Sequence, residues 1–177
     1  MKIACLGWGS LIWKPDVLPL AGEWRQDGPF MPIEFSRVGD GGELATAICM
    51  NAPLVQVYWS LLAAEDVRIA ASLLREREQI PADRVDGVGS LVLKSRPTGP
   101  LAEWAMEKKL DAVIWTALPP RIDGIEGRIP CAADVVNYLD SLQGEKRVHA
   151  QEYMRKVPAV FNTPYRKIIR MLPGWNC

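Results

Sequence analysis

The pattern of hydrophobic and polar positions predicts a β-rich first two thirds that contains one long helix, followed by a helical last third. Short apolar or alternating runs bounded by glycine, proline or asparagine are typical of strands, and they predict strands at 1–6, 31–36, 44–50, 54–61, 88–94 and 112–118. Helical spacing predicts helices at 64–79, 101–109, 132–142 and 146–156, and a final helix opened by Thr163-Pro164. This order indicates an α+β (mixed α/β) fold, not the regular βαβα alternation of a dinucleotide-binding domain.

The composition is that of an ordinary globular protein. The 177 residues are 49% hydrophobic and 24% charged, which argues against disorder. We expect a single domain over 1–177 with a helical C-terminal part from about residue 130. The 21 basic and 21 acidic residues cancel, which removes the electrostatic case for nucleic acid or an anionic membrane as a partner. No run approaches the ~18 consecutive apolar residues of a membrane span.

Cysteine and histidine usage narrows the possible chemistry. The four cysteines, at 5, 49, 131 and 177, form no CxxC pair. The apolar start, Ile3 to Leu6 followed at once by Gly7-Trp8-Gly9-Ser10, is too short and too structured for a secretory signal. We therefore expect reduced, mostly buried thiols in a cytoplasmic protein. The one histidine, His149, cannot supply a multi-histidine metal site, so we expect no metal. Catalysis must then rest on carboxylates, backbone amides or an unusual thiol.

One carboxylate falls on the apolar face of the long helix. At roughly 100° per residue, Glu78 lies in the stripe formed by Val67, Ala70, Ala71 and Leu74, whereas Glu76 points to the opposite side. Burial and a position in the last helical turn both raise the pKa of a carboxyl group, which suits a general base near neutral pH. The alternative is that the helix frays by Glu78, whose side chain then reaches water or pairs with a neighbouring arginine.

A glycine-rich turn follows the first strand. Gly7-Trp8-Gly9-Ser10 allows successive backbone N–H groups to approach a carboxylate or an oxyanion. It matches neither the dinucleotide-binding nor the phosphate-binding glycine pattern, nor the nucleophile elbow of hydrolases. A purely structural turn is the alternative.

These segments together resemble the γ-glutamylcyclotransferase superfamily, most closely its glutathione-degrading ChaC-like branch. Residues 7–13, GWGSLIW, differ from that branch's GYGSLIW only at Trp8, and 41–47, GGELATA, are similar to its GG-x-A-T strand. Residues 57–60, VYWS, stand at the place of its GVVW-type strand. Residues 74–78, LRERE, resemble the LxEREM or LDEQEG segment, whose second acid is catalytic. The resemblance covers about residues 1–95, in the family's order and spacing.

The resemblance implies a small β-barrel with flanking helices and a specific activity. A small γ-glutamyl compound, such as glutathione or a γ-glutamyl amino acid, would be converted to 5-oxoproline and a free amine without a cofactor. The catalytic glutamate falls on Glu78. The substrate-binding turn falls on Gly7, Trp8, Gly9, Ser10 and Leu11, with Trp8 in place of the usual tyrosine.

Two other functions stay open at this point. A protein of the same fold could bind a small molecule without catalysis, with Trp8 shaping an altered pocket, since a fold does not fix its chemistry. The enzyme could also act on another γ-glutamyl amine. The sequence indicates neither the oligomeric state nor the role of the C-terminal helices.

Overall fold

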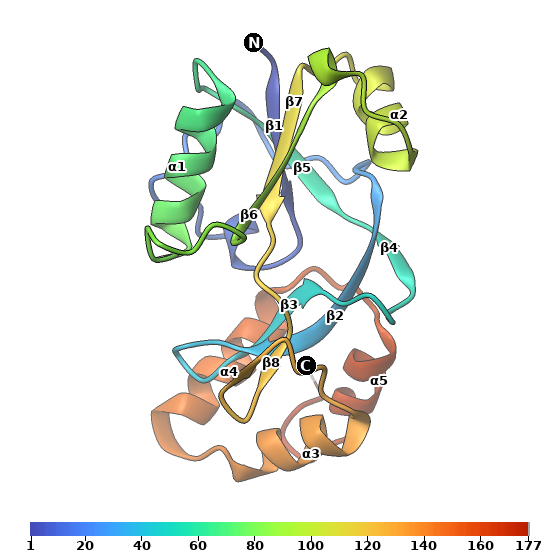
Figure 1. Cartoon of the computed structure of the whole chain (residues 1–177). Coiled ribbons are helices and arrows are strands. Elements are labelled where there is room, and N and C mark those ends of the chain that lie inside the picture. The colour runs from blue at the N-terminus through green and yellow to red at the C-terminus, as the bar shows by residue number, and fades with distance from the viewer. Residues whose placement is uncertain (177) are drawn as a thin grey trace. The chain divides into compact units, whose positions relative to one another are not determined.

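A computed structural model describes residues 1–176 as a mixed α+β fold (Figure 1). The strands are β1 (Ile3–Gly7), β2 (Phe30–Val38), β3 (Leu44–Ile48), β4 (Leu54–Gln56), β5 (Tyr58–Leu62), β6 (Val88–Val92), β7 (Ala112–Thr116), β8 (Arg121–Ile122) and β9 (Ile125–Glu126). The α-helices are α1 (Val67–Arg77), α2 (Pro100–Glu107), α3 (Ala132–Ser141), α4 (Gly144–Lys156) and α5 (Pro164–Arg170), and two 3₁₀ turns are η1 (Ser10–Ile12) and η2 (Leu93–Ser95). The expected α+β class is confirmed.

The chain forms two compact units, each built from separate stretches of sequence. Unit 1 comprises Met1–Gly7, Leu11–Phe30 and Gln56–Leu118. Unit 2 comprises Trp8–Ser10, Met31–Val55 and Pro119–Cys177. The single domain expected from the sequence stays a prediction.

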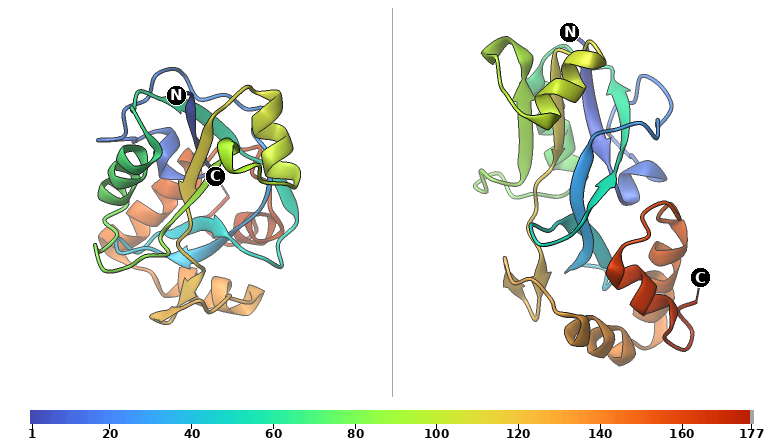
Figure 2. Two further views of the ribbon diagram at one scale, coloured as in Figure 1. Left: turned by 45° about the horizontal axis from the view of Figure 1, so that its top comes forward. Right: turned by 90° about the vertical axis from the view of Figure 1, so that its right-hand side faces the viewer.

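Unit 1 is a four-stranded sheet between two helices. The strand order is β5-β1-β7-β6, and β1 and β7 run parallel, whereas β5 and β6 are antiparallel to their neighbours. Helices α1 and α2 lie on opposite faces of this sheet (Figures 1 and 2). The α1 face buries Ile3, Cys5 and Ile114 against Ala70 and Leu74.

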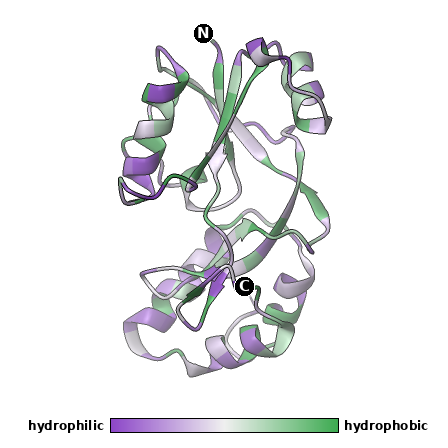
Figure 3. Cartoon of the chain, in the orientation of Figure 1, coloured by the Kyte–Doolittle hydropathy of each residue, from purple (hydrophilic) through white to green (hydrophobic). Residues whose placement is uncertain are grey.

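Strand β1 is apolar because both of its faces are covered. All five of its residues are buried, as expected for a strand with helices on each side. Figure 3 shows hydrophobic residues in β1 and β7 and hydrophilic residues on the outer side of α1. The core of unit 1 therefore lies at the centre of its sheet.

Unit 2 combines a smaller sheet with the three C-terminal helices. Its strand order is β3-β2-β8-β9, and β4 also pairs with β2. Helix α4 packs against β3, and α3 packs against α5. Helix α5 begins as the sequence predicts, with Thr163 as N-cap and Pro164 in the first turn.

The structure corrects the strand prediction at two places. The run 54–61 is not one strand: it divides into β4, which pairs with β2, and β5, which pairs with β1. The hairpin β8–β9 was not predicted, although its turn residues Asp123 and Gly124 both have positive φ, as a two-residue hairpin turn requires. Each of its strands has only two residues, too few to show an alternating pattern.

Two further observations concern the thiols and the helix lengths. Cys5 and Cys49 are buried, Cys131 is exposed, and all three are free thiols; Cys177 lies outside the described residues. Within residues 1–176, every helix is too short or too polar to cross a bilayer.

Candidate active site

Helix α1 has the phase that the sequence predicts. Ala70 and Leu74 are completely buried, whereas Ile69 and Glu76 are exposed. Glu78 follows Leu74 by one turn on the inner face, and its side chain is 19% exposed. The inward orientation of Glu78 follows from the helical period.

The end of α1 fixes the backbone at Glu78. Glu78 is the C-cap, and Gln79 after it takes the left-handed conformation, with φ of 55°. The N–H of Gln79 donates to the carbonyl of Glu76 at 3.1 Å, and that of Ile80 donates to the carbonyl of Arg75 at 3.0 Å. These two bonds form a Schellman motif. The helix therefore ends in a defined cap, and Glu78 is not frayed.

Both carboxylate oxygens of Glu78 contact groups of unit 1. The hydroxyl of Thr116, the last residue of β7, donates to Oε1 at 3.2 Å. Oε2 lies 3.9 Å from Nη1 of Arg77, a long ion pair. Pairing with a neighbouring arginine, the alternative raised from the sequence, is therefore present in part.

Glu78 also lies close to β1. Burial, and secondly the charge of Glu78, raise the pKa of the Cys5 thiol far above its ordinary value. A thiol that stays protonated is a poor nucleophile. The Cys5 Sγ–H instead donates to the carbonyl of Leu6, so Cys5 serves in packing.

The position of Glu78 is at the carboxyl end of the parallel strand pair. Cys5 of β1 pairs with Ile114 of β7, and two residues further on lie Gly7 and Thr116. Cys5 and Ile114 pack against α1. Because side chains alternate along a strand, Thr116, two residues after Ile114, faces α1 as well. The outer edge of parallel strands, at their carboxyl ends, is where α/β proteins commonly bind ligands.

Arg77 connects this edge to the chain that follows the glycine turn. Its Nε donates to the carbonyl of Lys14 at 2.9 Å and lies 3.5 Å from a carboxylate oxygen of Asp16. The Arg77 side chain is only 10% exposed. The end of α1 and the segment after η1 are thus fixed to each other within unit 1.

The predicted turn is shared between the two units. Gly7 and Leu11 belong to unit 1 with Glu78. A Cβ on Gly7 would lie 2.6 Å from the ring of Trp24, so the absence of a side chain admits this indole. Leu11 is buried in the cluster that contains Cys5 and Leu74.

The middle of the turn belongs to unit 2. Trp8 is 5% exposed, and its carbonyl accepts a hydrogen bond from the Thr46 hydroxyl at 2.8 Å. Gly9 and Ser10 are half-buried. Trp8, at the tyrosine position, is thus a packed residue, and the two residues after it are less deeply buried than it is.

Sequence reasoning missed two hydroxyl residues next to the predicted site. Thr116 is the only hydroxyl in the apolar run 112–118, and that polar position was an available signal. Thr46 lies in the segment that resembles the family's GG-x-A-T strand, but nothing in its spacing indicates the bond to Trp8.

The remaining chemistry of the described chain is limited. Among residues 1–176, no group of three or more histidine, cysteine or acidic side chains is arranged to hold a metal ion. His149 is a surface residue, with a 52% exposed side chain next to Glu43.

Comparison with known proteins adds no assignment: no family model matches the chain, and no curated protein matches it.

Proposed function

We propose that this protein is a γ-glutamylcyclotransferase-like enzyme that releases 5-oxoproline and an amine from a γ-glutamyl compound. The proposal includes the family's fold, a small β-barrel with flanking helices. One observation carries it: a half-buried glutamate, fixed by a helix cap and bonded to Thr116, lies where the parallel strands β1 and β7 end. Glu78 is also the residue that matches the family's catalytic acid.

The reaction needs little beyond folding the substrate and moving protons. The α-amine of the γ-glutamyl group attacks the γ-carbonyl carbon of the same molecule, and the new C–N bond closes a five-membered ring. Because nucleophile and electrophile belong to one molecule, binding in a near-attack conformation supplies much of the rate. No cofactor takes part in this scheme.

Glu78 is proposed to handle the proton. A free α-amino group has a pKa of about 8, so much of it is protonated at neutral pH. An ammonium nitrogen has no lone pair, so it first loses one proton, by way of the carboxylate, to the solvent. The carboxylate takes a second proton from the attacking amine as the tetrahedral oxyanion forms, and then delivers that proton to the leaving nitrogen as the amide C–N bond breaks. General acid–base catalysis of this kind contributes on the order of 10²- to 10⁴-fold.

The turn Gly7–Leu11 is proposed to bind the substrate. Gly9 and Ser10 are half-buried and carry no bulky side chain, and the backbone amides of such a turn suit a carboxylate or an oxyanion. Trp8 is buried, which favours backbone recognition over a contact made by the side chain at this position.

A panel of γ-glutamyl compounds tests the activity. The purified protein is incubated with glutathione, with γ-glutamyl amino acids and with γ-glutamyl derivatives of aliphatic amines, and 5-oxoproline is measured by chromatography. We expect at least one compound to give 5-oxoproline and amine in equal amounts, without an added cofactor. Binding of a panel member without turnover would favour the non-catalytic binding protein. If no compound of the panel is bound or turned over, only the likeness of sequence remains.

A further inference from the structure

We infer that Tyr153 of helix α4 is a positioning residue for the glycine turn. Through Thr46 of β3 it holds the segment Trp8–Ser10, and this gives a C-terminal helix a role in ligand binding. The effect on turnover rests on the proposed function. The effect on the conformation of the turn does not.

The hydrogen bonds form one buried chain. The Tyr153 hydroxyl accepts from the backbone N–H of Thr46 at 3.0 Å and lies 3.0 Å from Thr46 Oγ1. Thr46 Oγ1 in turn donates to the carbonyl of Trp8 at 2.8 Å. Since a threonine hydroxyl has one proton, which goes to Trp8, the Tyr153 hydroxyl is the donor to Thr46.

The position of β3 explains why a hydroxyl is needed there. β3 is at the edge of its sheet, so the N–H of Thr46 that points away from β2 has no neighbouring strand to accept it. Thr46 and Tyr153 are 8% and 7% exposed, and a buried N–H without an acceptor is costly. The Tyr153 hydroxyl satisfies this N–H and orients the Thr46 hydroxyl toward the turn.

The same two hydroxyls pack directly against Gly9. A Cβ on Gly9 would lie 2.8 Å from Thr46 Oγ1 and 2.8 Å from the Tyr153 hydroxyl. The φ angle of Gly9 is not positive, so glycine is required here by close packing and not by backbone conformation. The backbone of the turn at Gly9 therefore packs directly against the Thr46 and Tyr153 hydroxyls.

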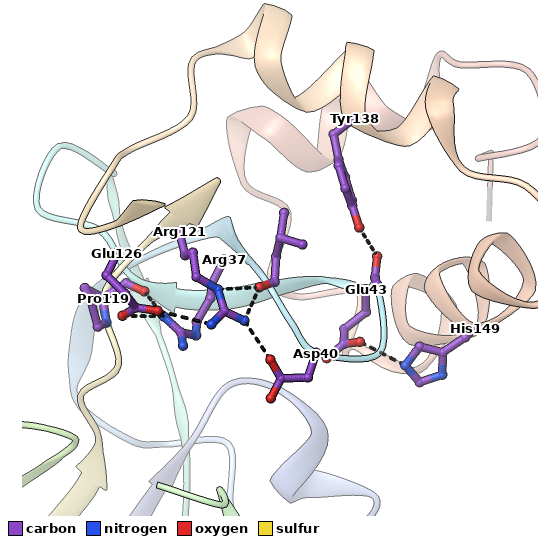
Figure 4. Close-up of polar contacts among 10 residues, drawn as sticks. Arg37, Asp40, Glu43, Pro119, Arg121, Glu126, Tyr138 and His149 are labelled. Atoms are coloured by element: carbon purple, nitrogen blue, oxygen red, sulfur yellow. Dashed lines mark hydrogen bonds and ion pairs between the residues drawn. The ribbon is translucent and has the colours of Figure 1, made fainter. Parts of the chain in front are cut away.

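Helix α4 is held in register by two more residues on the same face. Lys146, His149 and Tyr153 follow each other at intervals of three and four, so they share one side of the helix. Lys146 packs beside Gly42, and Nε2 of His149 lies 3.0 Å from a carboxylate oxygen of Glu43 (Figure 4). Tyr153 thus reaches Thr46 from a helix that is fixed along the start of β3.

Removal of the Tyr153 hydroxyl is expected to loosen the turn. Amides that hold the substrate's carboxylate do so equally in the ground state and in the transition state, so their misplacement raises KM and leaves kcat nearly unchanged. For Tyr153→Phe and for Thr46→Val we expect KM to rise about tenfold, with kcat within about threefold of wild type. Thr46→Ser keeps the hydroxyl, and its KM is expected to stay close to that of wild type.

The experiment has one measurement that needs substrate and one that does not. KM and kcat are measured with the best γ-glutamyl compound of the panel, and the Gly9 and Ser10 amides are followed by NMR chemical shift and hydrogen exchange. Glu152→Gln is the matched control: it removes an exposed polar contact of the same helix, to Lys156, that does not touch the turn. We expect the Gly9 and Ser10 amides to shift and exchange faster in Tyr153→Phe and Thr46→Val, but not in Thr46→Ser or Glu152→Gln.

The outcomes separate this inference from the proposed function. Unchanged Gly9 and Ser10 amides in both Tyr153→Phe and Thr46→Val overturn the positioning role, whether or not the protein is an enzyme. Perturbed amides in a protein that turns over no panel member support the positioning role and reject the proposed activity. Perturbed amides with an unchanged KM overturn the link between the turn and substrate binding.

Discussion

The Thr116 hydroxyl holds the Glu78 carboxylate in a defined orientation. The two residues are 38 positions apart in sequence and 3.2 Å apart between Oγ1 and Oε1. A base must be placed accurately, because a misplacement of about 1 Å can cost up to 10²-fold in rate. Thr116 is therefore the residue on which the geometry of the proposed base most plainly depends.

Replacing Thr116 by the isosteric valine is expected to lower kcat about tenfold with little change in KM, because Glu78 loses a bond that orients it. Steady-state kinetics with the best panel substrate measure this. Thr116→Ser keeps the hydroxyl, and its kcat should stay within about threefold of wild type. Thr98→Val is the control, because it makes the same change at an exposed site. A wild-type kcat in Thr116→Val would remove the orienting role.

A second carboxylate, Glu34 in unit 2, is more deeply buried than Glu78. It is 4% exposed. Its Oε1 accepts from the Phe35 N–H at 2.8 Å and from the Thr163 hydroxyl, and its Oε2 accepts from the Tyr165 N–H at 3.2 Å. Burial raises the pKa of Glu34 above its ordinary value of 4.5, and the three hydrogen bonds offset part of this effect.

The raised pKa of Glu34 predicts a pH-dependent stability. Between pH 4.5 and the raised value, the folded protein keeps a proton on Glu34 that the unfolded chain releases, so this contribution to stability falls as pH rises. The free energy of unfolding of wild type, relative to Glu34→Gln, is expected to be largest at low pH and to decrease toward neutrality. Urea unfolding at a series of pH values measures it, with the exposed Glu23→Gln as control. A relative stability that increases with pH would contradict the raised pKa.

At the scale of the element, α1 and α2 end in the same way without a glycine. Gln79 and Lys109 have φ of 55° and 57°, and each helix has the two hydrogen bonds of a Schellman motif. The next residues, Ile80 and Leu110, are buried. The sequence predicted that these helices end here but not how, because the usual glycine signal is missing.

Gln79→Gly and Lys109→Gly are each expected to stabilise the protein by about 0.5–1 kcal/mol, because glycine takes the left-handed conformation without the strain of a Cβ. Chemical denaturation of each variant and of the double variant measures the effect, which should be additive. Gln79→Ala keeps the Cβ and serves as the control. A loss of stability in both glycine variants would contradict this account of the two helix ends.

The C-terminal end of α4 depends on a buried arginine of α5. Nη2 of Arg166 donates to the carbonyls of Met154 and Val157 at 2.9 and 2.8 Å, and Nη1 donates to that of Pro158 at 2.7 Å. Arg166 is 2% exposed. Its planar guanidinium reaches several carbonyls at once, which an ammonium group cannot do.

Arg166→Lys is therefore expected to destabilise the protein by about 2–4 kcal/mol, since buried carbonyls lose their donors. Thermal and urea unfolding measure it. Arg170→Lys, in the same helix and bonded to the exposed Asn162, should stay within about 0.5 kcal/mol. Equal stability of the two variants would show that α4 does not need this cap.

At the scale of the whole chain, local patterns predicted the elements better than their partners. The α+β class, most strands and the inward face of α1 follow from periodicity. The division of 54–61 between two sheets does not, because an apolar run has the same pattern whichever strand it pairs with. The bonds from Thr116 to Glu78 and from Thr46 to Trp8 also join distant segments, so no local signal predicts them.

The interleaving of the two units in sequence also leaves no local signal. Residues 8–10 belong to unit 2 although the chain on both sides belongs to unit 1. A change of unit over three residues leaves no shift in composition, and the long linkers that mark domain boundaries are absent from this stretch. Sequence could therefore identify the turn as a candidate ligand site but not its packing against Thr46 and Tyr153.

The most direct test compares two glutamates of the same helix end. The rate of 5-oxoproline release is measured at saturating substrate for wild type, Glu78→Gln and Glu76→Gln, with unfolding curves to confirm equal folding. We expect Glu78→Gln to lose on the order of 10²- to 10⁴-fold in kcat, because the amide cannot take the proton from the α-amine, and we expect the exposed Glu76→Gln to match wild type. Wild-type turnover in a folded Glu78→Gln variant would contradict the account.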